Sequence, residues 1–202
     1  MRVGVLGGTF DPPHLGHLIL ASEAQTQLGL DVVLWVVTGR SPFKVDRAIT
    51  NAVHRVDMVR AAIVDNPAFE LSRIDVDRPG PHFTADMVAI IAQRRPDDEL
   101  FFLMGADSLA DFPRWQRPDA ILRCCSLAVL HRPGAEVDLD PLSAVVPGLA
   151  KKVQWVNAPQ LEISASDLRS RVQAGRSIRY FVPEAVREIV LRRGLYAPAA
   201  GV

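Results

Sequence analysis

The sequence predicts a doubly wound α/β fold, in which a mostly parallel sheet carries helices on both faces. Short apolar, β-branched segments alternate along the chain with segments whose apolar residues recur at helical spacing, which is typical of strand–helix–strand units. The segment "DVVLWVVT" is hydrophobic almost throughout, as in a strand covered on both faces. No repeat or long linker divides the chain, so we expect a single domain over residues 1–202, with a C-terminal helical part at about 163–195.

The individual elements follow from the same patterns. Strands are expected where apolar residues run together, in chain order at 2–7, 31–38, 69–74, 99–105, 125–132 and 153–158. Helices are expected where apolar residues recur every three or four positions, at 15–29, 50–66, 83–95, 118–124, 164–175 and 182–194. Suitable end residues support three of these helices: Gly29 as a stop, Thr50 or Asn51 as a cap, and Pro183 in a first turn. The stretch before residue 118 is expected to be irregular, and residues 136–152 to be a loop with a short helix.

This succession is that of a Rossmann-like fold, which binds ligands beyond the carboxyl ends of its strands, where the strand order reverses. The segment 7–18, "GGTFDPPHLGHL", follows the first strand and therefore lies where a nucleotide is expected.

Composition narrows the classes of protein that fit. Lysine plus arginine equal aspartate plus glutamate at 23 each, so no overall field attracts nucleic acid or an anionic membrane. Any anion site must therefore be local. No apolar run approaches the ~20 residues of a membrane-spanning helix, and the N-terminus lacks the pattern of a signal peptide. Cys124 and Cys125 are adjacent in an apolar segment and read as buried thiols, so a cytoplasmic location is expected.

The loop within segment 7–18 has the composition of a phosphate cradle. Gly7 and Gly8 allow a sharp turn and a close approach of backbone to ligand. Thr9 and Asp11 supply side-chain oxygens, although Asp11 is expected to be needed by its own loop. Two prolines then stiffen the chain and delay the start of the helix.

Two histidines stand where this helix begins. His14 lies at the start and His17 in the first turn, so both imidazoles project on the same side as the free backbone N–H groups. Such N–H donors and the positive end of a helix dipole favour the binding of a chain of phosphates. Two other readings remain open at this point: a His-x-x-His metal site, which lacks further ligands at local spacing, and a helix start with incidental histidines.

The spacing "GGTFDPPHLGH" resembles the signature of the nucleotidylyltransferase superfamily, with His14-Leu15-Gly16-His17 as its (T/H)-x-G-H element. Further stretches resemble the bacterial nicotinate-nucleotide adenylyltransferase family, in family order: "SPFK" at 41–44, "GPHFTADMV" at 80–88, "GADSLADFPRWQR" at 105–117 and "ISASDLR" at 163–169. Phe83 replaces a usual tyrosine, Gln116 stands where an aromatic residue is common, and Ala165 and Ser166 replace serine and threonine.

The resemblance implies adenylyl transfer from ATP to nicotinate mononucleotide (NaMN), with Mg²⁺ held mainly by phosphates and water. Catalysis is implied for His14, His17, Lys44 and Arg169. ATP contacts are implied for Gly7, Gly8, Thr9, Phe10, His17, Gly105, Asp107, Ser164, Ser166 and Arg169. NaMN contacts are implied for Lys44, Thr84, Trp115 and Arg132. No protein metal ligand is expected; the partners are the two small molecules, with neither nucleic acid nor membrane, and a homo-oligomer is compatible with the sequence.

Plainer readings stand beside several of these roles. Lys44 could be an ordinary surface lysine, Ser164 a helix cap, Asp107 a cap for the following helix, and Trp115 a core residue. Other activities also remain: pantetheine-phosphate adenylyltransferase or a cytidylyltransferase within the superfamily, or a nucleotide sensor that binds ATP without releasing pyrophosphate. A fragment related to class I aminoacyl-tRNA synthetases is set aside, because the chain has no basic extension and no clear Lys-Met-Ser-Lys-Ser loop.

Overall fold

The computed structural model describes residues 1–39, 49–131, 137–159 and 161–198. Within these ranges a six-stranded sheet has the order β3-β2-β1-β4-β5-β6, with every pair parallel. The strands are β1 (Arg2–Gly8), β2 (Val32–Val37), β3 (Phe69–Ser72), β4 (Glu99–Gly105), β5 (Ser126–His131) and β6 (Val153–Asn157). The strand order reverses direction between β1 and β4, which pair side by side. The predicted fold class is confirmed, and the sheet is wholly rather than mostly parallel.

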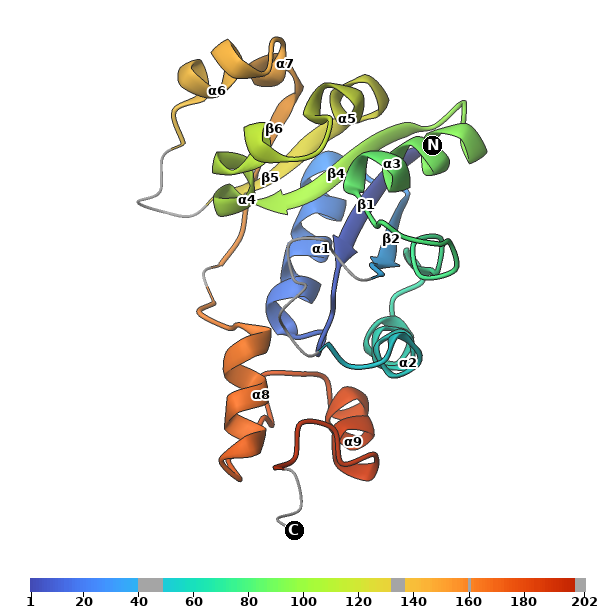
Figure 1. Cartoon of the computed structure of the whole chain (residues 1–202), viewed down its shortest axis with the longest axis vertical. Coiled ribbons are helices and arrows are strands. Elements are labelled where there is room, and N and C mark those ends of the chain that lie inside the picture. Colours follow the sequence, from blue (N-terminus) through green and yellow to red (C-terminus); the bar gives the residue numbers. More distant parts are fainter. Residues whose placement is uncertain (40–48, 132–136, 160, 199–202) are drawn as a thin grey trace.

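Helices cover both faces of the sheet (Figure 1). On one face, α1 (Leu15–Leu28) and α2 (Ala52–Ile63) pack in a cluster that includes Val33, Trp35 and Val37 of β2. The other face of β2 points Val32, Leu34 and Val36 into a second cluster. That cluster is built with α3 (Thr84–Arg94), α5 (Pro118–Cys124) and Leu149 of α7 (Leu149–Lys152). This alternation explains why the β2 sequence is apolar at every position.

A third cluster joins the C-terminal helices to the rest of the chain. α8 (Ala165–Gln173) and α9 (Glu184–Arg192) lie together below the tips of β1 and β2 (Figure 1). Leu168 of α8 and Val186 of α9 are fully buried and pack with Met58 of α2. The sequence predicted a helical part in this region. The structure shows that the apolar face of this part packs against α2.

The helix ends follow local chemistry. Gly29 adopts a left-handed conformation (φ 57°) at the end of α1, and its N–H donates to the Gln25 carbonyl. Asn51, rather than Thr50, caps α2, because its side chain accepts from the Val53 N–H. Pro183 immediately precedes Glu184, the first residue of α9.

Two segments are more helical than predicted. The stretch expected to be irregular contains α4 (Ala106–Ala110) and a 3₁₀ turn at Phe112–Arg114, because Leu109 and Phe112 are buried and fix short turns. The segment 137–152 holds two short helices, α6 (Leu139–Val145) and α7, instead of one. Elements of three to seven residues show too few repeats for a period to be recognised in the sequence.

No helix in the described ranges combines the length and apolar character needed to cross a bilayer.

The third cluster predicts a contrast between two leucines of the C-terminal helices. Replacing Leu168, which is 0 % exposed, in the variant Leu168→Ala should lower the free energy of unfolding by about 2–4 kcal/mol, since it leaves a cavity. Leu191→Ala makes the same chemical change at a side chain that is 58 % exposed and should alter the free energy by less than about 0.5 kcal/mol. Urea denaturation of both variants measures the difference; equal losses would show that α8 is not anchored in this way.

Candidate active site

The segment between β1 and α1 is shaped by the ring of Phe10. Phe10 has a left-handed conformation (φ 49°) and is only 2 % exposed. A Cβ at residue 8 would come within 2.8 Å of its ring, so Gly8 is the residue that leaves room for it. Because the side chain is buried, only the backbone of Phe10 is suited to meet a ligand.

The two histidine rings lie against each other at the start of α1. Their centroids are 3.7 Å apart, and the His17 ring meets Phe10 edge-on at 5.1 Å. A Cβ at residue 16 would lie 3.1 Å from Nδ1 of His14, so Gly16 gives the His14 ring its space. The predicted start of the helix at His14 or Leu15 is confirmed.

Both imidazoles are neutral in this arrangement. His14 is 8 % exposed, and burial lowers its pKa to about 4. The backbone N–H of His14 donates to Nδ1 of His17 at 3.2 Å. Since Nδ1 of His17 accepts, the ring proton of His17 resides on Nε2, which makes Nε2 a hydrogen-bond donor.

A buried carboxylate holds the middle of the loop. Asp11, 3 % exposed, accepts from the Tyr196 hydroxyl at 2.7 Å and from the Thr50 N–H at 3.2 Å. Its backbone carbonyl accepts from Nη1 of Arg169 at 2.8 Å. Burial and the Asp11 charge raise the pKa of Tyr196, so the hydroxyl stays a donor. The expectation that Asp11 serves its own loop is confirmed, and Tyr196 is a supporting residue that the sequence did not reveal.

A buried arginine ties this loop to the neighbouring strand. Arg55, 3 % exposed, donates to the carbonyls of Thr9 and Thr38 at 2.8 Å each and to that of Thr50 at 2.9 Å. Burial lowers its pKa, while the Asp11 charge opposes that effect. Arg55 therefore has a structural role, holding the ends of β1 and β2 at a fixed separation.

Three cavities in the described part of the chain border this loop. The first, of about 400 Å³, lies between α1 and α8, and its lining residues are Gly8, Thr9, Phe10, Asp11, His14, His17, Ile49, Ile163, Ser164, Ala165, Ser166 and Arg169. Ser164 caps α8 by accepting the Asp167 N–H at 3.0 Å, and its hydroxyl is 3.4 Å from that of Ser166. Two helix N-termini thus face one cavity, which is a strong arrangement for phosphates.

The second cavity, of about 660 Å³, continues from the first past the histidines. It shares His14, His17 and Ser164 with the first cavity. It is also lined by Gly105 and Asp107 at the start of α4, and by apolar residues that include Ile19, Leu20, Leu130, Pro159, Leu161 and Ile163. Its size and mixed lining suit a nucleoside, and Leu130 and His131 are lining residues absent from the sequence expectations.

The third cavity is smaller, at about 170 Å³, and shares Gly8 and Thr9 with the first. Thr84, the first residue of α3, lines it, and its contact to a small anionic group remains a prediction. Asp75 and His82 also line this cavity, and neither was among the residues expected from the sequence.

One expected substrate contact, Trp115, lies outside these cavities, and two others fall outside the described residues. Trp115 is partly buried, packs against the core with its ring 5.9 Å from Phe102 and 5.5 Å from Phe112, and lines none of these cavities. Its stacking on a pyridine ring stays a prediction. Lys44 and Arg132 lie outside the described residues.

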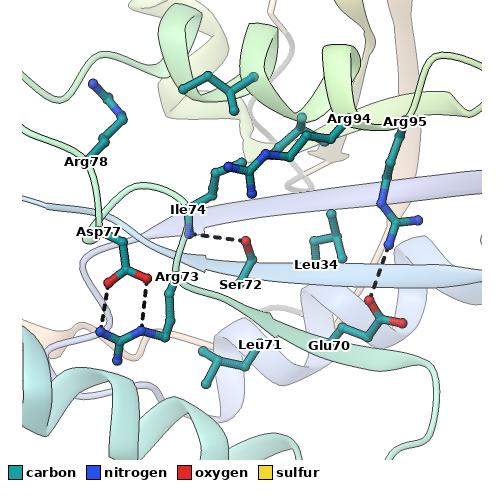
Figure 2. Close-up of a pocket in the computed structure, with 12 residues that line it drawn as sticks. Leu34, Glu70, Leu71, Ser72, Arg73, Ile74, Asp77, Arg78, Arg94 and Arg95 are labelled. Carbon is teal, nitrogen blue, oxygen red and sulfur yellow. Dashed lines mark hydrogen bonds and ion pairs between the residues drawn. The ribbon is translucent and has the colours of Figure 1, made fainter.

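A further cavity of about 450 Å³ lies between β3 and α3, away from the histidines (Figure 2). The described residues around it include four arginines, but three are paired with acids: Arg73 with Asp77, Arg95 with Glu70, and Arg78 with Asp75. Because these three arginines are paired with acids, little of their positive charge is available to bind an anion. The histidine loop is therefore the stronger candidate for the phosphate site.

Among the described residues, no three His, Cys, Asp or Glu side chains are grouped closely enough to hold a metal ion.

Comparisons with known proteins identify relatives of this chain. Residues 5–171 match the family model of cytidylyltransferase-like proteins. The chain is 46 % identical over 195 residues to a probable nicotinate-nucleotide adenylyltransferase of Thermomicrobium roseum, covering 96 % of this chain and 91 % of the relative. It is 42 % identical over 194 residues to the protein of the same description from Roseiflexus sp. RS-1, covering 96 % and 97 %.

Solved structures share the fold. The nicotinic acid mononucleotide adenylyltransferase of Plasmodium falciparum, complexed with NaAD, superimposes with a TM-score of 0.78 at 17 % identity, covering 96 % of this chain and 97 % of that one.

The hydrogen bond from Tyr196 to Asp11 predicts unequal effects of two tyrosine substitutions. Tyr196→Phe removes a donor from a buried carboxylate and should lower the free energy of unfolding by about 1–3 kcal/mol. Tyr180→Phe makes the same change at a side chain that is 82 % exposed and should leave it within about 0.5 kcal/mol. If urea denaturation finds the two variants equally stable, the Tyr196 hydroxyl does not support the loop.

The buried His14 predicts a specific loss of stability in acid. Its folded pKa of about 4 is below the ordinary 6.5, so between these pH values the unfolded chain binds a proton that the folded chain does not. The contribution of His14 to the free energy of unfolding is at its full value above pH 6.5 and falls by on the order of 3 kcal/mol as the pH drops to about 4. His14→Asn should remove this component from urea denaturation measured across that pH range. An unchanged pH dependence in the variant would contradict a buried, neutral His14.

Proposed function

The chain belongs to the nicotinate-nucleotide adenylyltransferase family of cytidylyltransferase-like proteins, and on that basis we propose that it transfers the adenylyl group of ATP to nicotinate mononucleotide. The products are nicotinate adenine dinucleotide, the deamido form of NAD, and pyrophosphate, in the biosynthesis of NAD. The observation that carries the proposal is that the first cavity adjoins the second at His14 and His17 and the third at Gly8 and Thr9. One cavity suits a nucleoside, one a triphosphate and one the pyridine end of the second nucleotide.

The reaction needs alignment more than a strong base. An oxygen of the NaMN phosphate attacks the α-phosphorus of ATP and forms a new P–O bond. The bond from that phosphorus to the oxygen bridging to the β-phosphate breaks, and pyrophosphate leaves with the electron pair. Because the attacking phosphate is already anionic near neutral pH, the protein has to hold the two nucleotides in line and stabilise the charge that develops.

The neutral histidines suit this task. Nε2 of His17 is a hydrogen-bond donor, because Nδ1 is occupied by the His14 N–H. We infer that His17 donates to the α-phosphate; the catalytic role of His14, which lines the same two cavities, remains a prediction. Nη1 of Arg169 donates to the Asp11 carbonyl, which fixes the guanidinium at the edge of the first cavity. We propose that its other N–H groups bind the β- and γ-phosphates.

Adenosine would occupy the second cavity. Asp107, in the first turn of α4, is suited to accept the ribose hydroxyls there. Ser164 and Ser166 at the start of α8 would bind the far phosphates, together with backbone N–H groups of that helix.

Nicotinate mononucleotide would enter from the side of the third cavity. Thr84 offers a hydroxyl and the N–H groups of the α3 terminus to the nicotinate carboxylate. Lys44, Trp115 and Arg132 remain predicted contacts to this substrate.

Magnesium bound to the triphosphate would neutralise part of its charge, and we expect phosphates and water to be its main ligands. We also propose a cytoplasmic location, which suits the free thiols of Cys124 and Cys125.

The proposal predicts pyrophosphate release that depends on His17. With ATP and NaMN, His17→Asn should lower kcat by about 10²–10³, since it removes a donor to the transition state. His54→Asn is the matched control, because His54 lies on α2 against Arg193 and outside these cavities. A pyrophosphate assay measures both variants.

Two results would contradict the proposal. Turnover by the unmodified chain with phosphopantetheine but not with NaMN would make it a pantetheine-phosphate adenylyltransferase. ATP binding without any pyrophosphate release would make it a nucleotide sensor.

A further inference from the structure

The buried side chain of Arg55 donates hydrogen bonds to three backbone carbonyls. Arg55 belongs to α2 and is only 3 % exposed. Its Nη1 donates to the carbonyls of Thr9 and Thr38 at 2.8 Å each, and its Nε donates to the carbonyl of Thr50 at 2.9 Å. Arg55 therefore acts directly on peptide groups, and the direction of each peptide decides what that action does.

The peptide between Thr38 and Gly39 shows the principle. A trans peptide group points its C=O and its N–H in opposite directions. Here the carbonyl accepts from Arg55, and the Gly39 N–H donates to Oδ2 of Asp75 at 2.8 Å. Arg55 and Asp75 thus hold this peptide from its two sides and fix its orientation.

The peptide between Thr9 and Phe10 is held from one side only. It is trans, and its carbonyl accepts from Arg55, so the Phe10 N–H points away from the guanidinium. Among the described residues, no acceptor for the Phe10 N–H is found. Phe10 is 2 % exposed and lines the first cavity. Because buried backbone N–H groups are nearly always paired, this N–H is a donor left for a ligand of that cavity.

The backbone conformation of Phe10 makes the direction of this N–H depend on its surroundings. Its φ of 49° is a left-handed conformation, which a bulky residue keeps only where neighbouring groups fix it. The rings of His17 and Trp35 pack against the Phe10 side chain, while Arg55 holds the carbonyl that precedes it. Loss of the guanidinium frees the Thr9–Phe10 peptide to rotate, which turns the N–H away from the cavity.

Arg55 itself is not placed to contact a phosphate. It is absent from the described residues that line the three cavities. The negative charges of Asp11 and Asp75 also act on it and offset its own charge. Any effect of Arg55 on a ligand is therefore transmitted through the Thr9 carbonyl, whose hydrogen bond also strengthens the peptide N–H as a donor.

We propose that Arg55 is a positioning residue for adenylyl transfer, which aims the Phe10 N–H at the phosphates of ATP by holding the Thr9 carbonyl. The inference rests on the proposed function, because it takes the first cavity as the triphosphate site. A donor that is already fixed needs no rearrangement when charge develops on a phosphate. Arg55 thus acts on the rate of transfer more than on the affinity for either nucleotide.

The first test compares the same exchange at two arginines of α2. Arg55→Lys keeps the positive charge, but the single nitrogen of lysine cannot occupy both the Nε and the Nη1 positions. With ATP and NaMN, this variant should lower kcat by at least about tenfold and leave the KM for NaMN unchanged. Arg60→Lys makes the same change at a side chain that is 59 % exposed and should keep the full kcat.

The second test reads the Phe10 N–H directly, from its backbone amide signal in NMR spectra of the ¹⁵N-labelled protein. When α,β-methylene-ATP and Mg²⁺ are added to the unmodified protein, the signal should move downfield, because the N–H gains an acceptor. In Arg55→Lys the signal should differ before any ligand is added, and its movement on binding should be smaller.

A third variant separates positioning from a general loss of stability. Leu149 of α7 is fully buried and lines none of the three cavities. Leu149→Ala should therefore destabilise the protein, as urea denaturation measures, while kcat and the Phe10 amide signal stay as in the unmodified protein.

The outcomes distinguish the inference from the proposed function. An Arg55→Lys enzyme with full kcat overturns the inference, and so does an equal loss of kcat in Leu149→Ala. A Phe10 amide signal that does not move when the analogue binds the unmodified protein also overturns it, and this result needs no variant that folds. Absence of turnover with NaMN in the unmodified protein defeats the proposed function instead, while the amide titration still decides the role of Arg55.

Discussion

The site depends on the buried carboxylate of Asp11. A loop that leaves β1 and reaches α1 without regular structure has no ladder of backbone hydrogen bonds to hold it. Asp11 holds the loop instead. Its carboxylate accepts hydrogen bonds from Thr50 and Tyr196, and its backbone carbonyl accepts one from Arg169. Arg55 of α2 adds a further contact by donating to the Thr38 carbonyl, just beyond the end of β2. These contacts join both ends of the chain at one point, so Arg169 and the histidine loop keep a fixed relation.

That constraint explains how a protein with no net charge can present an anion site. The positive potential comes from local features: the N-termini of α1 and α8, the Arg169 guanidinium, and the Nε2–H group of His17. Burial keeps His14 neutral near pH 7, so the ring adds a packing surface rather than a charge. Preorganised neutral donors need no rearrangement when charge develops on a phosphate, and this suits a transfer that proceeds by alignment.

The sequence predicted the strands, the longer helices and the histidine loop because each depends on neighbouring residues. Residues 15–29, for example, follow two prolines and end at a glycine that stops the helix. It did not reveal α4, which has five residues, too few to show a period. The role of Tyr196 was not predicted either, since 185 positions separate it from Asp11 and no local sequence pattern connects the two residues. Asp75 and His82 were missed for the same reason: their meeting with Gly39 depends on how β2 and the chain after β3 pack.

A crystal structure of the chain with a non-hydrolysable ATP analogue tests the central claim most directly. The account predicts that the triphosphate lies between the start of α1 and the start of α8, with Nε2 of His17 and the Arg169 guanidinium at hydrogen-bonding distance, about 2.7–3.2 Å, from phosphate oxygens. A triphosphate bound elsewhere, for example among the arginines between β3 and α3, with both imidazoles free of contact, would contradict it.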